Sequence, residues 1–98
     1  PVELSDLKRL THLFKHPTTE LTLDPSYEPE RAGNEDASVP PPDPVKNADF
    51  KVLQKLARVN LVRPVGAEHM WHAAMGSKAC ELTVLGQHYW RLADEKLI

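Results

Sequence analysis

The stretch that decides the fold is residues 53–62, which read Leu-Gln-Lys-Leu-Ala-Arg-Val-Asn-Leu-Val. Apolar residues in and just before it recur at helical spacing, namely Val52, Leu53, Leu56 and Val59. They predict a helix over 48–59, with Asn47 as its N-cap. Asn60 is then expected to end the helix, because asparagine follows glycine in tolerating the left-handed backbone there. Residues 61–63 predict a short strand.

The remainder of the C-terminal half predicts a β-hairpin followed by a helix. Pro64 and Gly66 should end the first strand, and residues 69–75 have the composition of a second strand. Residues 76–78, Gly-Ser-Lys, predict a tight turn that leads into a partner strand over residues 79–82. Thr83 is a good cap for a last helix over 84–96. The predicted inward face of that helix is Leu85, Tyr89, Leu92 and the stem of Lys96.

The N-terminal half divides into a helix and a long acidic segment. Residues 3–15 carry apolar side chains at helical spacing, and Ser5 or Glu3 is available to cap them. Residues 17–46 hold seven of the nine prolines and seven acidic residues against Arg31 and Lys46. Such a segment buries too little apolar surface to offset its ordering entropy, so a loop is expected. Within it, Leu21 and Leu23 favour a short strand that Pro25 ends.

Composition sets limits on the class of protein. The chain has 98 residues, which predicts one domain, and its net charge of −2 does not by itself indicate binding to nucleic acid or to a membrane. Outside the acidic segment the balance is ten Lys and Arg to seven Asp and Glu. Cys80 is the single cysteine, and neither a signal pattern nor a membrane-length apolar run is present. These features predict one cytoplasmic domain without membrane association.

Two motifs give the chain a resemblance to a known family. Residues 53–62 resemble the end of a recognition helix running into a first wing strand, with Asn60 where glycine is usual. Residues 81–87, Glu-Leu-Thr-Val-Leu-Gly-Gln, resemble a Leu-Thr-x-x-Gly element in which the last wing strand turns into a capped helix. Both are similar to winged helix-turn-helix regulators of the MarR, HxlR and ArsR kind. Over residues 47–98 the resemblance implies an α+β winged-helix-like fold, with helices packed on a small antiparallel sheet and residues 67–82 as the wing.

The resemblance also implies a small transcriptional regulator that binds double-stranded DNA, as a homodimer. Lys51, Lys55 and Arg58 recur along one face of the predicted helix, with Gln54 beside them. Lysine and arginine bind phosphates and guanine edges, and glutamine binds adenine. Two further cations could add contacts to the DNA backbone, Arg63 and Lys78. The competing interpretation is a solvated charged face, on an interaction module that does not bind DNA.

Several features keep alternatives open. Trp90, Leu97 and Ile98 form either a dimer surface or, for Trp90, a cover over its own domain. The acidic segment 17–46 is a spacer, a protein-binding segment or a tethered competitor of nucleic acid. A zinc site is disfavoured because a strand would point His69 and His72 to opposite faces. Ser5 and Lys8 have the spacing of a Ser-x-x-Lys nucleophile, but Ser5 is better explained as a cap. We therefore expect no enzymatic activity, metal or cofactor.

Overall fold

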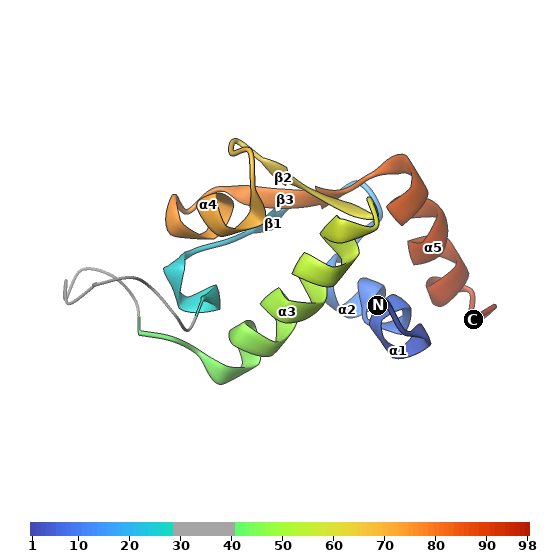
Figure 1. Ribbon diagram of the computed structural model, residues 1–98. Coiled ribbons are helices and arrows are strands. Elements are labelled where there is room, and N and C mark those ends of the chain that lie inside the picture. The colour runs from blue at the N-terminus through green and yellow to red at the C-terminus, as the bar shows by residue number, and fades with distance from the viewer. Residues whose placement is uncertain (29–40) are drawn as a thin grey trace.

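The protein is a small α+β structure, seen in a computed structural model that describes residues 1–28 and 41–98. In this part of the chain, three short strands form one antiparallel sheet in the order β1-β3-β2. The strands are β1 (Leu21–Thr22), β2 (Val62–Val65) and β3 (Ala79–Leu82). Figure 1 shows the long helix α3 (Pro44–Arg58) crossing beneath the sheet, with α5 (Val84–Asp94) at the end of the molecule near both termini.

The first predicted helix is divided at Arg9 into α1 (Leu4–Lys8) and α2 (Leu10–Leu13). Glu3 rather than Ser5 is the N-cap, and its backbone N–H donates to the Asp6 carboxylate at 2.9 Å. The chain then reaches β1, as expected for the leucines of this segment, and a 3-10 turn, η1 (Pro25–Tyr27), follows it. All three residues of η1 are buried, so this part of the predicted loop belongs to the folded domain. Residues 29–40 of that loop lie outside the described residues.

The helix predicted over 48–59 begins earlier than expected. Asp43 is its N-cap, and its carboxylate accepts from the N–H groups of Val45 and Lys46 at 2.9 and 3.2 Å. Proline at the first helical position suits this start, because its missing N–H would have had no partner there. Asn47 is therefore not the cap, and its side-chain amide instead donates to the Ser26 carbonyl at 3.0 Å.

The predicted end of α3 is confirmed. Asn60 has a φ of 62°, and its N–H donates to the carbonyl of Ala57 at 3.1 Å. The N–H of Leu61 donates to the carbonyl of Leu56 at 2.9 Å, and both side chains are buried. These two bonds form a Schellman motif, in which a left-handed residue satisfies the last carbonyls of the helix. The motif directs the chain from α3 straight into β2.

The predicted hairpin wing over residues 67–82 is wrong in its first half. Residues 69–75 contain a helix, α4 (Met70–Met75), where a strand was expected. Met70, Ala73 and Ala74 are buried at helical spacing, and alanine is the strongest helix former. The strand β3 is confirmed, and it pairs with β2 from Val62 opposite Leu82 to Val65 opposite Ala79. Pro64, which was expected to stop β2, lies within it, as an edge strand allows.

The helix α5 begins as predicted, but its predicted inward face is only partly buried. Tyr89 and Leu92 are half-buried, whereas Leu85 and Lys96 are exposed. Thr83 is the N-cap, and its hydroxyl accepts from Gly86 N–H at 3.0 Å and donates to the Asn60 carbonyl at 2.7 Å. Gly86 lies so close to the backbone of Leu61 that an alanine Cβ would be 1.9 Å from the Leu61 carbonyl oxygen. Gly86 and Trp90 are consequently the buried residues, and Leu85 is 47% exposed.

The core joins all the elements around the sheet. Phe14, Phe50, Leu53, Leu56 and Cys80 are essentially inaccessible to solvent. The ring of Tyr27 packs edge-on against that of Phe50, with centroids 6.2 Å apart. Trp90 closes the core near α2, where its indole N–H donates to the Phe14 carbonyl at 2.9 Å. Among the described residues, no helix combines the length and the apolar character needed to cross a bilayer.

Candidate nucleic-acid interface

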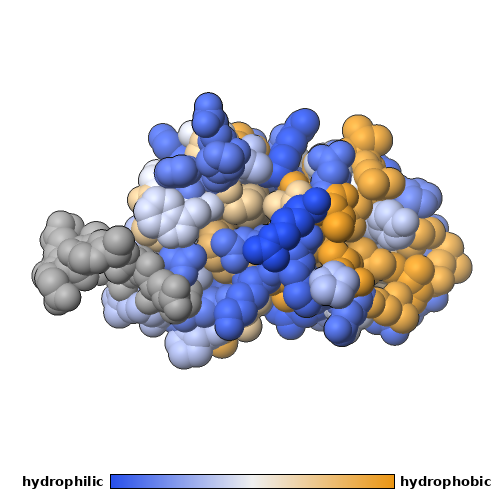
Figure 2. Space-filling view, viewed as in Figure 1, coloured by the Kyte–Doolittle hydropathy of each residue, from blue (hydrophilic) through white to orange (hydrophobic). Residues whose placement is uncertain are grey.

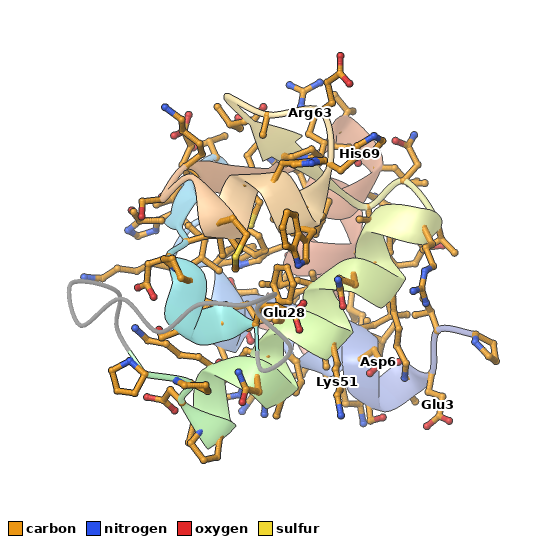
Figure 3. The ribbon with its side chains drawn as sticks, turned by 60° about the vertical axis from the view of Figure 1, so that its left-hand side comes forward. Glu3, Asp6, Glu28, Lys51, Arg63 and His69 are labelled. Carbon is orange, nitrogen blue, oxygen red and sulfur yellow. The ribbon has the colours of Figure 1, made fainter. Side chains whose placement is uncertain are left out.

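The outward face of α3 carries the basic stripe that the sequence indicated. Because Phe50, Leu53 and Leu56 bury the opposite face, Lys51 and Arg58 are left exposed. Figure 3 shows Lys51 projecting away from the sheet. The acidic residue of this helix, Asp49, is bound to the guanidinium of Arg9 on its flank. The outward face is therefore positively charged.

Lys55 differs from its two neighbours because it is part of an ion pair. Its Nζ lies 3.1 Å from the carboxylate of Asp6, which is 6% exposed. The pKa of Asp6 is lowered, chiefly by the hydrogen bond from the Glu3 backbone N–H and also by Lys55. These two effects outweigh burial, which raises the pKa. Lys55 thus holds α1 against α3, and any contact with a phosphate would compete with that role. The pair joins residues 49 positions apart, so the sequence alone did not reveal it.

A hollow of about 510 Å³ opens between the C-terminal half of α3, the strand β2 and the start of α4. Two of the predicted DNA-binding residues of α3, Gln54 and Arg58, line it, and so does Arg63 of β2. The hollow therefore brings together polar groups from three elements that are separate in the sequence. Its full lining is Gln54, Ala57, Arg58, Asn60, Val62, Arg63, Pro64, Glu68, His69, Met70 and Trp71.

Arg63 is oriented by the strand next to it. Its Nε donates to the carboxylate of Glu81 at 2.7 Å, and the two residues are directly opposite in the β2–β3 ladder. Within residues 1–28 and 41–98, the two terminal amino groups of this guanidinium have no hydrogen-bond acceptor, and the side chain is 62% exposed. In Figure 3, Arg63 and His69 lie at the same edge of the molecule. Both line the hollow, so they belong to one surface.

Lys78, the last predicted DNA-binding residue, is not part of this cluster. It precedes β3, and the aliphatic part of its side chain lies beside Gly66 and Gly76. Conversely, His69 and Trp71 line the hollow although no prediction linked them to it. Their region was interpreted as a strand of the wing, and the structure shows the start of α4 instead. The helical spacing of Met70, Ala73 and Ala74 could have indicated a helix that leaves Trp71 exposed, but not the hollow, which also depends on α3 and β2.

The predicted oligomer surface is only partly exposed. Trp90, offered for that surface, is 9% exposed and hydrogen-bonded within its own domain, so it is not available to a second chain. Leu97 is 67% exposed and Ile98 is half-buried. Figure 2 shows apolar side chains gathered at the end of the molecule where Figure 1 places α5. The large apolar side chains of α5 that remain exposed are Val84 and Leu85.

The histidine and cysteine residues do not assemble into a metal site in the described part of the chain, where no group of three potential ligands comes together. His69 and His72 are close, with ring centroids 5.6 Å apart. His69 is the N-cap of α4 and His72 lies within it, so the expected strand geometry does not apply. Cys80 is completely buried, as its position in an apolar strand predicted. Burial raises the pKa of the Cys80 thiol to about 12, so the thiol is neutral and unreactive in the folded protein.

Comparisons with protein-family models, with curated proteins and with solved structures found nothing similar to this chain.

Proposed function

We propose that this chain is a small winged-helix DNA-binding protein, a transcriptional regulator that inserts α3 into the major groove. The observation that carries the proposal is the outward face of α3, where Lys51, Gln54 and Arg58 stand on a helix anchored at both ends. The Schellman motif at Asn60 fixes this helix to β2. Thr83 fixes α5 to the same junction through the Asn60 carbonyl.

The chemistry of this face suits a duplex. A helix of 15 residues is about 22 Å long, and the major groove is about 12 Å wide, so α3 can lie within it. Arg58 is suited to a guanine edge or a phosphate, Gln54 to an adenine edge and Lys51 to a phosphate. Lys55 is paired with Asp6, so this pair adds no net charge to the face. Arg63, beside the same face, is suited to a backbone phosphate, and Lys78 would contact the backbone separately.

The order of elements supports a winged-helix relationship. A helix passes through a left-handed residue into β2, β2 pairs antiparallel with β3, and β3 turns at Thr83 into a capped helix. This is the arrangement that the two sequence motifs imply. The departure is α4, which occupies the position of a hairpin tip. In this proposal the wing is therefore short and packed, and the contacts next to the helix come from β2 and the start of α4.

Salt-dependent binding to duplex DNA tests the proposal. Replacing both Lys51 and Arg58 by alanine should weaken binding and reduce the slope of log K against log salt by about 1.8, because each phosphate contact contributes about 0.9. Lys55 is left intact, since its loss would leave Asp6 buried without its partner. The matched control replaces Lys8 and Lys15, two exposed lysines outside α3. Equal effects of the two double variants, or no salt-dependent binding at all, would refute the proposal.

An exposed apolar surface favours a second candidate, an interaction module that does not bind DNA. Val84 and Leu97 are 84% and 67% exposed, and Figure 2 shows apolar side chains gathered at the end of the molecule where Figure 1 places α5. Apolar groups that gather on a surface commonly mark a protein interface. A homodimer through this surface is part of the leading proposal as well, and Leu85→Glu should dissociate it in sedimentation at micromolar concentration. Self-association together with failure to bind duplex DNA would favour the second candidate. The acidic segment 17–46 remains a proposed protein-binding region.

A further inference from the structure

We propose that the hollow between α3, β2 and α4 binds an unpaired nucleotide of a single-stranded nucleic acid, with the base against Trp71 and the phosphate on Arg58 and Arg63. This site differs from the major-groove face of α3 in its contacts with β2 and α4, although Gln54 and Arg58 belong to both. The inference does not rest on duplex recognition. It rests on three properties of the hollow, which are its charge, its exposed aromatic ring and its shape.

The charge of the hollow fits a phosphodiester. Arg58 and Arg63 come from different elements and line the same space, and Glu68 is the acidic residue that lines it. The lining residues alone carry one net positive charge, and the ion pair between Arg63 and Glu81 offsets part of it, so Arg58 is the cation of the hollow without a paired carboxylate among the described residues. Glu81 accepts from Arg63 Nε at 2.7 Å, and the two terminal amino groups of the guanidinium have no acceptor among the described residues, so they are available to an oxyanion. Arginine binds phosphate through such a pair of parallel hydrogen bonds.

An aromatic ring lies beside these cations. Trp71 lines the hollow and is 38% exposed, although tryptophan is a residue that folding normally buries. Its ring is steadied by an edge contact with His72, with centroids 5.3 Å apart. Any base can stack on such a ring, because every base has a π face, and stacking tolerates sequence variation. A base inside a duplex is already stacked on both sides, so the partner must be unpaired.

The shape of the hollow favours a polymer over a free metabolite. Sites for small molecules usually enclose most of the ligand surface. This hollow has a suitable volume, about 510 Å³, but it is open to solvent. An open hollow lets a sugar-phosphate chain enter and leave, while one base and one phosphate are held. His69 and Gln54 at its rim offer further hydrogen bonds to a base or a sugar.

The test uses oligothymidylate of eight nucleotides and the whole chain. Titration should change the emission of the wild-type protein but not that of Trp71→Phe, because the other tryptophan, Trp90, is buried. With labelled oligonucleotide, Trp71→Ala should weaken binding about 5- to 150-fold, and Trp71→Phe should retain most of the affinity. Arg63→Gln should reduce the salt slope by about 0.7, and Arg91→Gln, on the exposed side of α5, should not.

Three results would overturn the inference. An unchanged Trp71 signal at millimolar oligonucleotide, or full affinity in a Trp71→Ala variant that melts like the wild type, would remove the site. Thymidine 5′-monophosphate binding as tightly as the oligonucleotide would make the hollow a site for free nucleotides and overturn the single-stranded assignment. Duplex binding is measured separately, so its failure would refute the proposed function and leave this result standing.

Discussion

Replacing Gly86 by alanine should strongly destabilise the protein, although helix propensity alone predicts the opposite sign. In an exposed helix interior, glycine to alanine stabilises by about 1 kcal/mol. At residue 86 the added Cβ would lie 1.9 Å from the carbonyl oxygen and 2.9 Å from the carbonyl carbon of Leu61. Both atoms are backbone, and the same carbonyl accepts the Thr83 N–H at 3.0 Å. Relief therefore requires α5 to move away from β2.

The magnitude follows from what that movement disrupts. Overpacking a rigid site costs about 1–3 kcal/mol, and loss of the Thr83 cap adds about 1 kcal/mol. After subtraction of the propensity gain of about 1 kcal/mol, a loss of about 1–3 kcal/mol is expected for Gly86→Ala. For a domain of this size, that loss lowers the Tm by about 4–24 °C.

Thermal and urea unfolding followed by far-UV circular dichroism measure this effect. The control is Val84→Ala in the same turn of α5, where the side chain is 84% exposed and a change within about 0.5 kcal/mol is expected. An unchanged or raised midpoint for Gly86→Ala would refute the close approach of α5 to Leu61.

Three further predictions concern single contacts. Because residue 60 has a φ of 62°, Asn60→Gly should be neutral or slightly stabilising in urea unfolding, whereas Asn60→Ala should lower the free energy of unfolding by about 1 kcal/mol. Equal effects of the two substitutions would argue against a left-handed residue at the end of α3. Trp90→Phe should cost about 1–3 kcal/mol by the same assay, since the Phe14 carbonyl loses its buried donor, and a neutral result would contradict that bond. The pKa of Asp6 is lower in the folded than in the unfolded protein, so its ionised carboxylate stabilises the fold. This stabilisation is fully present at a pH above the ordinary pKa of about 3.9, and it is lost as the pH falls from there through the folded pKa. Asp6→Asn should flatten stability against pH in this acid range, and an unaltered profile would exclude the effect.

Local signals made the junctions around β2 and β3 predictable. Asn60 ends α3 because few residues adopt a left-handed backbone, and that requirement is visible in the sequence. Thr83 starts α5 through its own hydroxyl, three residues before Gly86. Such features depend on neighbours in the chain, so the end of α3, the strand β3 and the start of α5 were found at or near their true positions.

The errors arose where distant contacts decide. Residues 69–75 are short enough for their apolar residues to fit either a strand or a helix, and burial against the sheet and η1 selects α4. Asp43 is the N-cap of α3 in the structure, but it lies in the proline-rich segment that was predicted to be a loop, so the helix start was placed too late. Trp90 is buried by a bond to a carbonyl 76 residues away, and Lys55 is held by Asp6, 49 residues away. Contacts between residues so far apart cannot be detected from the pattern of a single sequence.

The candidate site also has a part that local sequence predicts, the basic face of α3, and a part that depends on distant contacts, the hollow. The basic face of α3 followed from helical spacing, since Lys51 and Arg58 share a face through the geometry of one element. The hollow did not follow, because it is made by side chains of α3, β2 and the start of α4 together. Sequence periodicity describes one element at a time, whereas a hollow is a relation among several.

Pro64 within β2 has a consequence for how copies of this protein can meet. It lies in an edge strand and has no N–H, so that border of the sheet lacks a donor that an incoming chain would need. The other border is β1, a strand of only two residues. A second folded molecule therefore cannot form a full set of hydrogen bonds with β2, and β1 is too short to pair with more than a few of its residues. Crowding or heating should produce fibrils only after the sheet has come apart.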